Sequence, residues 1–255
     1  MRNVAQVADA LAKWIGEQAK QAQVAGLIVG VSGGVDSAVA AGLCARVLPE
    51  RTYGAILPCE SAQEEIDRAE IVVKAFGLGR IYHPLEEACP SIASGLPGSS
   101  RLAQANLKAR VRMATLYLYA NQYNLLVVGT GNKSEDDIGY MTKYGDSGVD
   151  ICPLSDLYKS EVYQLAAHLG VPQQVMDAAP SAGLWPGQTD EEEIGIPYGK
   201  IEWILRKLDG EDVENRIAEA GITEAEIEQV ATRRERNRHK VCYPPVFEAR
   251  SIIQE

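Results

Sequence analysis

The chain has 255 residues, 46% of them hydrophobic and 24% charged, and a formal net charge of -10, which is the balance of an ordinary globular protein. The acidic charge disfavours sequence-independent binding to DNA or RNA, because such binding needs basic residues that neutralise phosphates. The apolar runs are too short to cross a membrane, and the amphipathic N-terminus lacks the unbroken apolar stretch of a signal peptide.

The chain opens with a predicted helix that is followed by a predicted buried strand. Apolar residues recur at helical spacing from Val4 to Ile15. Residues 26–31 then form a continuous apolar run, which is typical of a parallel strand covered on both faces. Ser32-Gly33-Gly34 ends this strand, and residues 35–47 predict a second helix.

The same alternation continues for about a hundred residues more. A capping box at 61–64 predicts a helix to about Phe76, and a long helix is predicted over 100–120. Further strands are expected at 53–57, more weakly at 81–85, and at 125–128, which ends in Gly129-Thr130-Gly131. This alternation favours an α/β fold with a parallel sheet flanked by helices and right-handed crossovers. Ligands of such sheets lie beyond the carboxyl ends of the strands, so the loops there are the first candidates for a site.

The second half is expected to be mainly helical. Ser155 is expected to cap a helix that ends at Gly170. Residues 180–198 show no clear period, which is typical of a long loop, and such loops are usually functional lids or disordered. No repeat or linker is apparent, so we expect a single domain over 1–255. Two closing helices are predicted at 198–208 and 223–238.

The cysteines give no sign of a metal site or of a disulfide framework. They are odd in number and include no C-x-x-C pair. We therefore expect free thiols in the reducing cytoplasm. The five residues are Cys44, Cys59, Cys89, Cys152 and Cys242.

The most informative motif is Ser32-Gly33-Gly34-Val35-Asp36-Ser37, placed between the apolar strand and the second helix. The two glycines let the backbone turn tightly and approach a ligand closely. The helix that follows presents unpaired N–H groups and a positive dipole end to an anion. Ser32 and Ser37 add hydroxyl donors, and the Asp36 carboxylate is suited to the magnesium that accompanies a nucleotide phosphate. No lysine follows the glycines, so the motif is not a P-loop of the Walker type.

This hexapeptide resembles the pyrophosphate-binding loop of the PP-loop, or N-type, ATP pyrophosphatases. That superfamily splits ATP between the α and β phosphates, usually to adenylate an oxygen of a second substrate. It has a Rossmann-like fold of the adenine nucleotide alpha hydrolase type. GMP synthetases, asparagine synthetases and tRNA-modifying enzymes belong to it as well, so the loop leaves the activity open.

Later motifs resemble NAD synthetase, and the resemblance runs from the first helix almost to the C-terminus. It is densest from 106 to 198. The motifs are Asn106-Leu-Lys-Ala-Arg-Val-Arg-Met113, Gly129-Thr-Gly-Asn-Lys-Ser-Glu135, Gly139-Tyr-Met-Thr-Lys-Tyr-Gly-Asp146, Pro180-Ser-Ala-Gly-Leu-Trp185, Gly187-Gln-Thr-Asp190 and His239-Lys240.

The resemblance implies roles for individual residues. Magnesium is expected on Asp36 and Glu135, and not on the adjacent Asp136 or Asp137. Lys159 is expected to grip the ATP phosphates and to act in catalysis. ATP is expected to contact Gly30, Val31, Ser32, Gly33, Gly34, Val35, Asp36, Ser37, Thr130, Lys159 and Ser181. Deamido-NAD is expected to contact Arg110, Lys143, Asp150, His239 and Lys240.

The implied reaction is the amidation of deamido-NAD to NAD, the last step of NAD biosynthesis. The nicotinate carboxylate attacks the α-phosphorus of ATP and expels pyrophosphate, and ammonia then displaces AMP. Asp146 is a hypothesis for the group that binds or deprotonates ammonium, and the alternative is that it only shapes its turn. Free ammonia is the expected nitrogen donor, since no cysteine has a nucleophile context, unless a separate glutaminase docks.

Family resemblance also implies a homodimer with the 100–120 helix at its interface. One rival interpretation is another PP-loop pyrophosphatase, either a tRNA-modifying or a GMP synthetase-like enzyme. The acidic chain disfavours the first of these. Another is a nucleotide-binding regulator without catalysis, which would need neither the Asp36 and Glu135 pair nor a second polyanion site.

Overall fold

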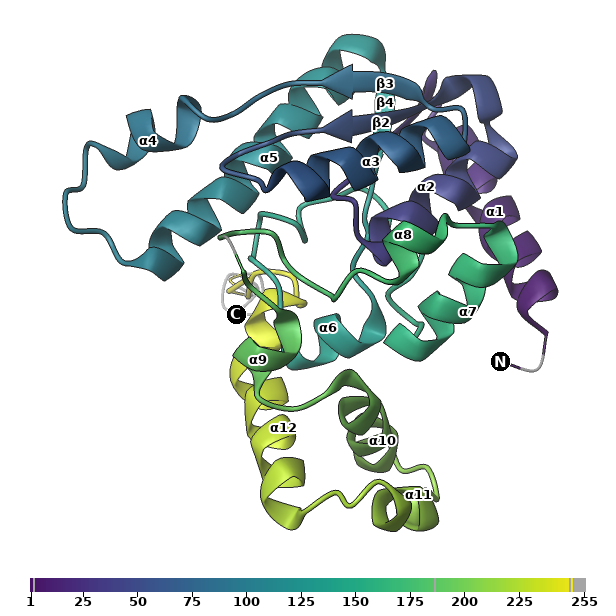
Figure 1. Ribbon diagram of the computed structural model, residues 1–255, viewed down its shortest axis with the longest axis vertical. Helices are drawn as coiled ribbons and strands as arrows, with labels where there is room; N and C mark the ends of the chain where they lie inside the picture. Colours follow the sequence, from purple (N-terminus) through teal and green to yellow (C-terminus); the bar gives the residue numbers. More distant parts are fainter. Residues whose placement is uncertain (2, 186, 248, 250–255) are drawn as a thin grey trace.

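The computed structural model describes residues 1, 3–185, 187–247 and 249 and shows a four-stranded parallel sheet between helices (Figure 1). The strand order is β3-β2-β1-β4. The strands are β1 (Gly26–Gly30), β2 (Thr52–Ile56), β3 (Gly79–Tyr82) and β4 (Leu125–Val128). The predicted α/β fold is thereby confirmed, and all three strand pairs are parallel.

The central strand β1 buries side chains on both faces, as its apolar run predicts. Leu27 and Val29 pack with α1 (Val4–Gln21), α2 (Val35–Val47), α3 (Gln63–Ala75) and α7 (Lys159–Leu169). Ile28 faces the opposite side and packs with residues of α5 (Arg101–Tyr123) and with Cys89 of α4 (Ala88–Ala93). Helices therefore cover both faces of the sheet, and the site can open only at the strand ends.

The C-terminal part of the chain forms a helical unit with its own apolar core. Ile201, Ile204 and Leu205 are fully buried in this core. Tyr158 and Ile138 join it from the α/β part. Figure 1 shows α9 to α12 gathered below the sheet layers. The unit consists of α9 (Asp190–Ile194), α10 (Tyr198–Leu208), α11 (Glu214–Glu219) and α12 (Glu224–Asn237), followed by the 3-10 turn η2 (Arg238–Lys240).

Two predicted helix caps are wrong. The capping box expected at 61–64 does not form: the N-cap is Ala62, which has no side-chain acceptor, and only the Glu65 half of such a box exists, accepting the N–H of Ala62 at 3.2 Å. Ser61 instead accepts a hydrogen bond from Arg112 at 3.2 Å. Ser155 does not cap the helix that ends before Gly170, which begins only at Lys159.

The true cap of α7 comes from two other residues. Glu161 accepts the N–H of Tyr158 at 2.9 Å, and Ser134 of α6 (Lys133–Ile138) accepts the N–H of Lys159 at 3.1 Å. A distant hydroxyl can replace the local one because the fold brings α6 against the start of α7. Lys159 consequently becomes the first residue of α7.

The short helices are not predicted from the sequence, because one or two turns are too few to establish a helical period of apolar residues. They are α4, α6, α8 (Gln173–Met176), α9 and α11, and α9 lies inside the predicted loop at 180–198. Residue 186 of that loop is outside the described residues. None of the helices in the described part of the chain combines the length and apolar character that a membrane crossing requires.

Candidate functional site

A cavity of about 880 Å³ lies beyond the carboxyl ends of the strands. Its lining comes from the β1–α2 loop, the ends of β2 and β4, helices α3 and α5, residues 178–185, and the C-terminal α12 and η2. Segments far apart in the sequence therefore meet at one place. An α/β sheet binds its ligand where several strand ends converge in this way.

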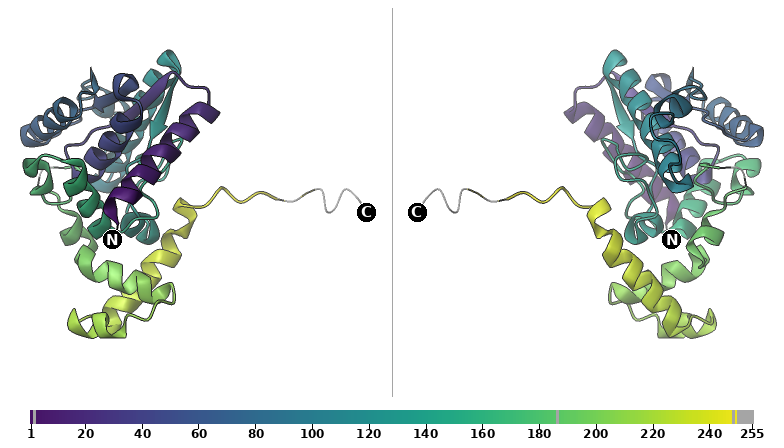
Figure 2. Two further views of the ribbon diagram at one scale, coloured as in Figure 1. Left: turned by 90° about the vertical axis from the view of Figure 1, so that its right-hand side faces the viewer. Right: turned by 90° about the vertical axis from the view of Figure 1, so that its left-hand side faces the viewer.

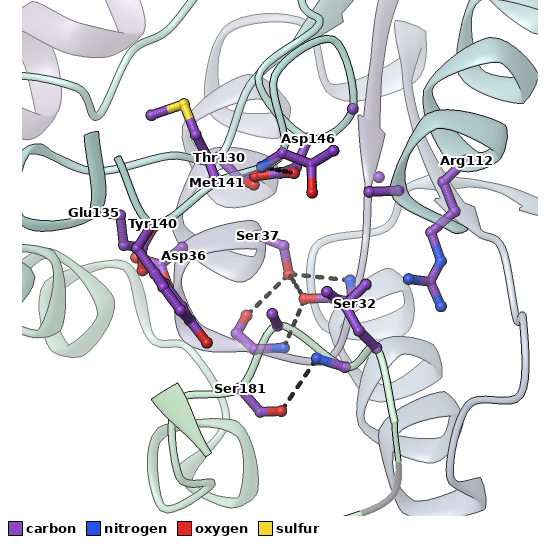
Figure 3. A pocket seen from close by; sticks show the side chains of 18 of the residues that line it. Ser32, Asp36, Ser37, Arg112, Thr130, Glu135, Tyr140, Met141, Asp146 and Ser181 are labelled. Atoms are coloured by element: carbon purple, nitrogen blue, oxygen red, sulfur yellow. Dashed lines mark hydrogen bonds between the residues drawn. The ribbon is translucent and has the colours of Figure 1, made fainter. Parts of the chain in front are cut away.

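The β1–α2 loop is held in shape by its two serines (Figure 3). Ser32 donates its N–H to Ser37 Oγ at 3.2 Å, and Gly34 donates its N–H to Ser32 Oγ at 3.2 Å. The Ser37 hydroxyl donates to the Gly34 carbonyl at 2.9 Å, and the two hydroxyl oxygens are 3.1 Å apart. This network wraps the loop around the N-terminus of α2, where backbone N–H groups can bind a phosphate.

Gly33 has a backbone that other residues rarely adopt. Its φ is +83°, and a Cβ at this position would come 2.5 Å from the carbonyl oxygen of Glu65. The loop therefore packs directly against the backbone of α3, which leaves no room for a side chain. Arg68 of α3 also donates to the Gly33 carbonyl at 3.3 Å, which fixes the loop from the same side.

Asp36 and Glu135 converge on one position although they follow different strands. Asp36 lies in the first turn of α2, after β1, and Glu135 lies in the first turn of α6, after β4. The ammonium of Lys159 bridges them, with Nζ 2.6 Å from Asp36 Oδ2 and 2.9 Å from Glu135 Oε1. Asn132 is fully buried and donates to the other Asp36 oxygen at 2.8 Å.

A second hydrogen-bond network ties the helical unit to these acids. Tyr198 donates to Asp190 at 3.0 Å and lies 3.3 Å from Glu135 Oε1. The Tyr140 hydroxyl oxygen lies 3.1 Å from Asp190 and 2.9 Å from Glu193, so its single proton can be donated to either carboxylate. Asp190 is almost completely buried, so the two phenols offset the cost of placing its carboxylate there.

Burial dominates the electrostatics of the acid pair. It raises the pKa of Glu135 to about 7, with Lys159 opposing the shift and Asp36 adding to it. Burial alone would lower the pKa of Lys159, but the charges of Asp36 and Glu135 raise it well above its usual range. The lysine is therefore held as a cation, although a positive charge at the N-terminus of α7 opposes the helix dipole.

The acid pair fits a magnesium ion in number and kind of ligand. Within the described ranges no cluster brings together three or more His, Cys, Asp and Glu residues that could hold a metal. Magnesium commonly uses one or two carboxylates, with the remaining ligands supplied by water and substrate phosphates. Asp36 and Glu135 lie close enough to hold one cation between them, as their contacts with the Lys159 ammonium show.

The neighbouring acids Asp136 and Asp137 have other partners. Burial raises the pKa of Asp136 to about 6, and a hydrogen bond with Ser155 opposes the shift. Asp137 pairs with Lys133 at 3.0 Å and with Arg234 at 3.6 Å. The choice of Glu135 alone from the three adjacent acids stays a prediction.

Asp146 lines the same cavity from the loop after α6. Its Oδ1 accepts the N–H of Thr142 at 2.9 Å, which closes the turn. Burial raises the pKa of Asp146, while its hydrogen bonds with Thr142 oppose the shift. The carboxylate therefore shapes its turn and also faces the cavity, so the geometry accommodates both interpretations of this residue.

Four of the predicted deamido-NAD residues lie together. Arg110 of α5 donates to the Lys143 carbonyl at 3.3 Å, and Lys143 Nζ donates to the His239 carbonyl at 2.6 Å. Lys240 Nζ donates to the carbonyls of Gly139 and Met141 at 2.7 and 3.0 Å. His239 and Lys240 line the cavity, whereas Arg110 and Lys143 lie outside its lining.

Asp150 stands apart from these four. It accepts from the Tyr117 hydroxyl at 2.8 Å and from the Val127 N–H at 2.8 Å, and it does not line the cavity. The two remaining predicted ATP residues do line it. Thr130 follows β4, and Ser181 accepts the N–H of Gly183 at 3.1 Å within the 178–185 segment.

Several residues in and around the cavity were not singled out from the sequence, and of these Arg112, Tyr140, Asp190 and Arg233 belong to its lining. Lys108 is buried, forms an ion pair with Glu60 and donates to the Leu184 carbonyl at 2.8 Å. It thereby connects the 178–185 segment to the residues that follow β2. Arg112 donates to the Leu57 carbonyl at 3.1 Å. Lys108, Arg112, Asn132, Tyr140 and Asp190 all lie inside the quoted motifs, which is the only signal that marks them. Tyr198 and Arg233 fall outside those motifs.

Comparison with known proteins shows extensive similarity. The profile of the family described as NAD synthase matches residues 7–244. An NH(3)-dependent NAD(+) synthetase of Archaeoglobus fulgidus is 45% identical over 231 residues, which are 89% of this chain and 90% of that protein.

Two solved structures are also similar. The NMN synthetase from Francisella tularensis has a TM-score of 0.86 and 33% identity, covering 96% of this chain and 98% of that one. The NH3-dependent NAD synthetase from Campylobacter jejuni has a TM-score of 0.82 and 27% identity, covering 96% and 99%.

The substitution Gly33→Ala tests the phosphate-binding loop. A methyl group would meet the Glu65 carbonyl and would require an unfavourable φ, so the loop must shift. We expect ATP affinity, measured by calorimetry, to fall on the order of tenfold or more.

Gly77→Ala is the matched control, because Gly77 also has a positive φ, of +62°, but nothing lies within 4 Å of an added Cβ. It carries the backbone strain without the clash. Equal ATP binding by the Gly33 variant and the wild type would contradict the assignment of this loop.

Proposed function

The chain belongs to the NAD synthase family, and we propose that its cavity holds ATP and deamido-NAD side by side for the ATP-dependent amidation of deamido-NAD with ammonia. The enzyme is thus a ligase that forms a carbon–nitrogen bond in the last step of NAD biosynthesis. The observation that supports this site is the convergence of Asp36, Glu135 and Lys159 beside an anion-binding loop. Neither rival interpretation is favoured by the comparisons.

The ATP phosphates fit the N-terminus of α2. The Ser32 to Ser37 loop offers hydroxyl and backbone donors, and Lys159 supplies a buried cation beside it. Asp36 and Glu135 would hold magnesium, which screens the charge of the departing pyrophosphate when it is bound. Thr130 and Ser181 complete the wall around the nucleotide.

The first chemical step activates a poor electrophile. The nicotinate carboxylate attacks the α-phosphorus of ATP, an anhydride bond to AMP forms, and pyrophosphate leaves. The cations of the site lower the repulsion between the two anionic substrates and stabilise the charge that develops on the leaving group. Much of the rate enhancement then comes from the alignment of the carboxylate with the α-phosphorus, since both substrates are held in one cavity.

The second step uses ammonia as the nucleophile. Ammonia attacks the acyl carbon of the adenylate, AMP departs, and the amide remains. The Asp146 carboxylate faces the cavity and suits the binding of ammonium and the acceptance of its proton. The Archaeoglobus relative carries the name NH(3)-dependent, and the same nitrogen donor is proposed here.

A homodimer explains why Arg110, Lys143 and Asp150 lie outside the cavity of one chain. All three lie on or beside the outer face of α5, where exposed apolar side chains also gather. Leu118 is 62% exposed and Tyr123 is 56% exposed on this helix. A second copy packed against α5 would cover them and bring these polar residues to the deamido-NAD site. A cytoplasmic location stays a prediction from the sequence.

The amidation itself is tested with purified protein, ATP, magnesium, deamido-NAD and an ammonium salt. We expect AMP and pyrophosphate in equal amounts with NAD. Because the Francisella structure is that of an NMN synthetase, nicotinic acid mononucleotide is the informative second substrate. We expect kcat/KM for the dinucleotide to be higher by about tenfold or more, and release of neither AMP nor pyrophosphate with either substrate would refute the activity.

The substitution Asp146→Asn separates the two chemical steps. It keeps an acceptor for the Thr142 N–H, so the turn should persist. We expect exchange of pyrophosphate into ATP to continue while the ammonia-dependent rate falls by about 100-fold.

The pH profile gives a second readout for Asp146. Burial raises the pKa of this carboxylate, so the wild-type rate should fall on acidification as Asp146 becomes neutral. The variant should lack that acid limb. An unchanged ammonia-dependent rate and pH profile would leave Asp146 only the role of shaping its turn.

The substitution Leu118→Arg tests the dimer. We expect the wild type to sediment with twice the mass of the chain and the variant to sediment as a monomer with weaker deamido-NAD binding. Leu208→Arg is the control, because Leu208 is also exposed but lies on α10 in the helical unit. A wild type that is monomeric at working concentration while it binds deamido-NAD would rule out the shared site.

A further inference from the structure

The ammonium of Lys159 lies between the two acids that are predicted to hold magnesium. Nζ lies between the two carboxylates, 2.6 Å from Asp36 and 2.9 Å from Glu135. The side chain of Lys159 is only 5% exposed, and those of the two acids are 17% and 16% exposed. Two cations cannot share this small space, because their mutual repulsion is strong where little water screens it.

Both oxygens of Asp36 already accept a hydrogen bond. Its Oδ1 accepts from Asn132, and its Oδ2 accepts from Lys159. On the other acid, Glu135 Oε1 accepts from Lys159 and also lies 3.3 Å from the Tyr198 hydroxyl. A metal ion placed between the two carboxylates therefore competes with the ammonium for the oxygens that converge there, Asp36 Oδ2 and Glu135 Oε1.

The surroundings hold the ammonium firmly while no other cation is present. Asp190 adds a third negative charge beside the pair, through its hydrogen bond with Tyr198. The Tyr198 ring lies under the ammonium, with Nζ 4.9 Å from its centroid. Removal of a buried cation without replacement would leave these acids uncompensated, which is costly.

We propose that Lys159 is an internal counter-ion that excludes divalent metal from the Asp36 and Glu135 pair until a triphosphate arrives to take its ammonium. The proposal rests on the proposed function of the site. The phosphate chain attracts the ammonium toward the N-terminus of α2, and the acids then become free for the metal. Lys159 is thus a positioning residue that makes metal binding depend on the nucleotide.

The direct test is the binding of Mn²⁺ to the nucleotide-free protein, followed by electron paramagnetic resonance. We expect the wild type to bind the ion weakly alone and to show a protein-bound signal when a non-hydrolysable ATP analogue is added. Lys159→Met should bind Mn²⁺ without nucleotide more tightly than the wild type, by about tenfold or more. Its melting temperature should rise more with Mn²⁺ than that of the wild type, since the ion replaces the lost cation.

Three controls identify the group responsible. Lys159→Arg keeps the positive charge and should gain no affinity for Mn²⁺. Lys133→Met also removes a lysine from an acid pair, Asp137 and Asp209, and should gain none because Arg234 remains beside these acids. Asp36→Asn added to Lys159→Met should abolish the gain, which places the ion at the predicted pair.

The outcomes separate this inference from the function. Tight Mn²⁺ binding by the nucleotide-free wild type overturns the counter-ion role, and this measurement needs no variant to fold. Equal Mn²⁺ affinity of Lys159→Met and the wild type overturns it as well. In both cases the release of AMP and pyrophosphate by the wild type would leave the proposed function standing.

Discussion

The site depends on the burial of two carboxylates at the ends of separate strands. Asp36 and Glu135 can be buried together only because Lys159 compensates their charge at 2.6 and 2.9 Å. A buried acid pair without a cation would be strongly destabilising. The same arrangement that stabilises the nucleotide-free protein therefore also keeps two acids and a cation together at the strand ends.

The parallel sheet supplies the geometry for this compensation. β1 and β4 are neighbours, so the loops that follow them open at the same edge and bring both acids together. Each acid lies in the first turn of a helix, α2 or α6, where the dipole favours a negative charge. Lys159 lies in the first turn of α7 against the dipole, so its position is a compromise that the acids make favourable.

The helical unit contributes side chains to the candidate site. Asp190 and Tyr198 reach from it to the acid pair, and His239 and Lys240 reach from its end to the cavity wall. Its apolar core includes Ile138 from α6 and Tyr158 next to α7. Movements of this unit would therefore act on the two helices that carry Glu135 and Lys159, and through them on the proposed ATP site.

The sequence alone determined the alternation of strands and helices, the phosphate loop and the family, because these follow from local periodicity and contiguous motifs. It placed β4 and α2 without error. Only the tertiary structure decided where helix α7 begins, since the Ser134 hydroxyl that caps it comes from 25 residues away. It also decided that Lys159 bridges the acids and that Asp150 lies outside the cavity lining, because such contacts depend on how distant segments pack and no local pattern encodes them.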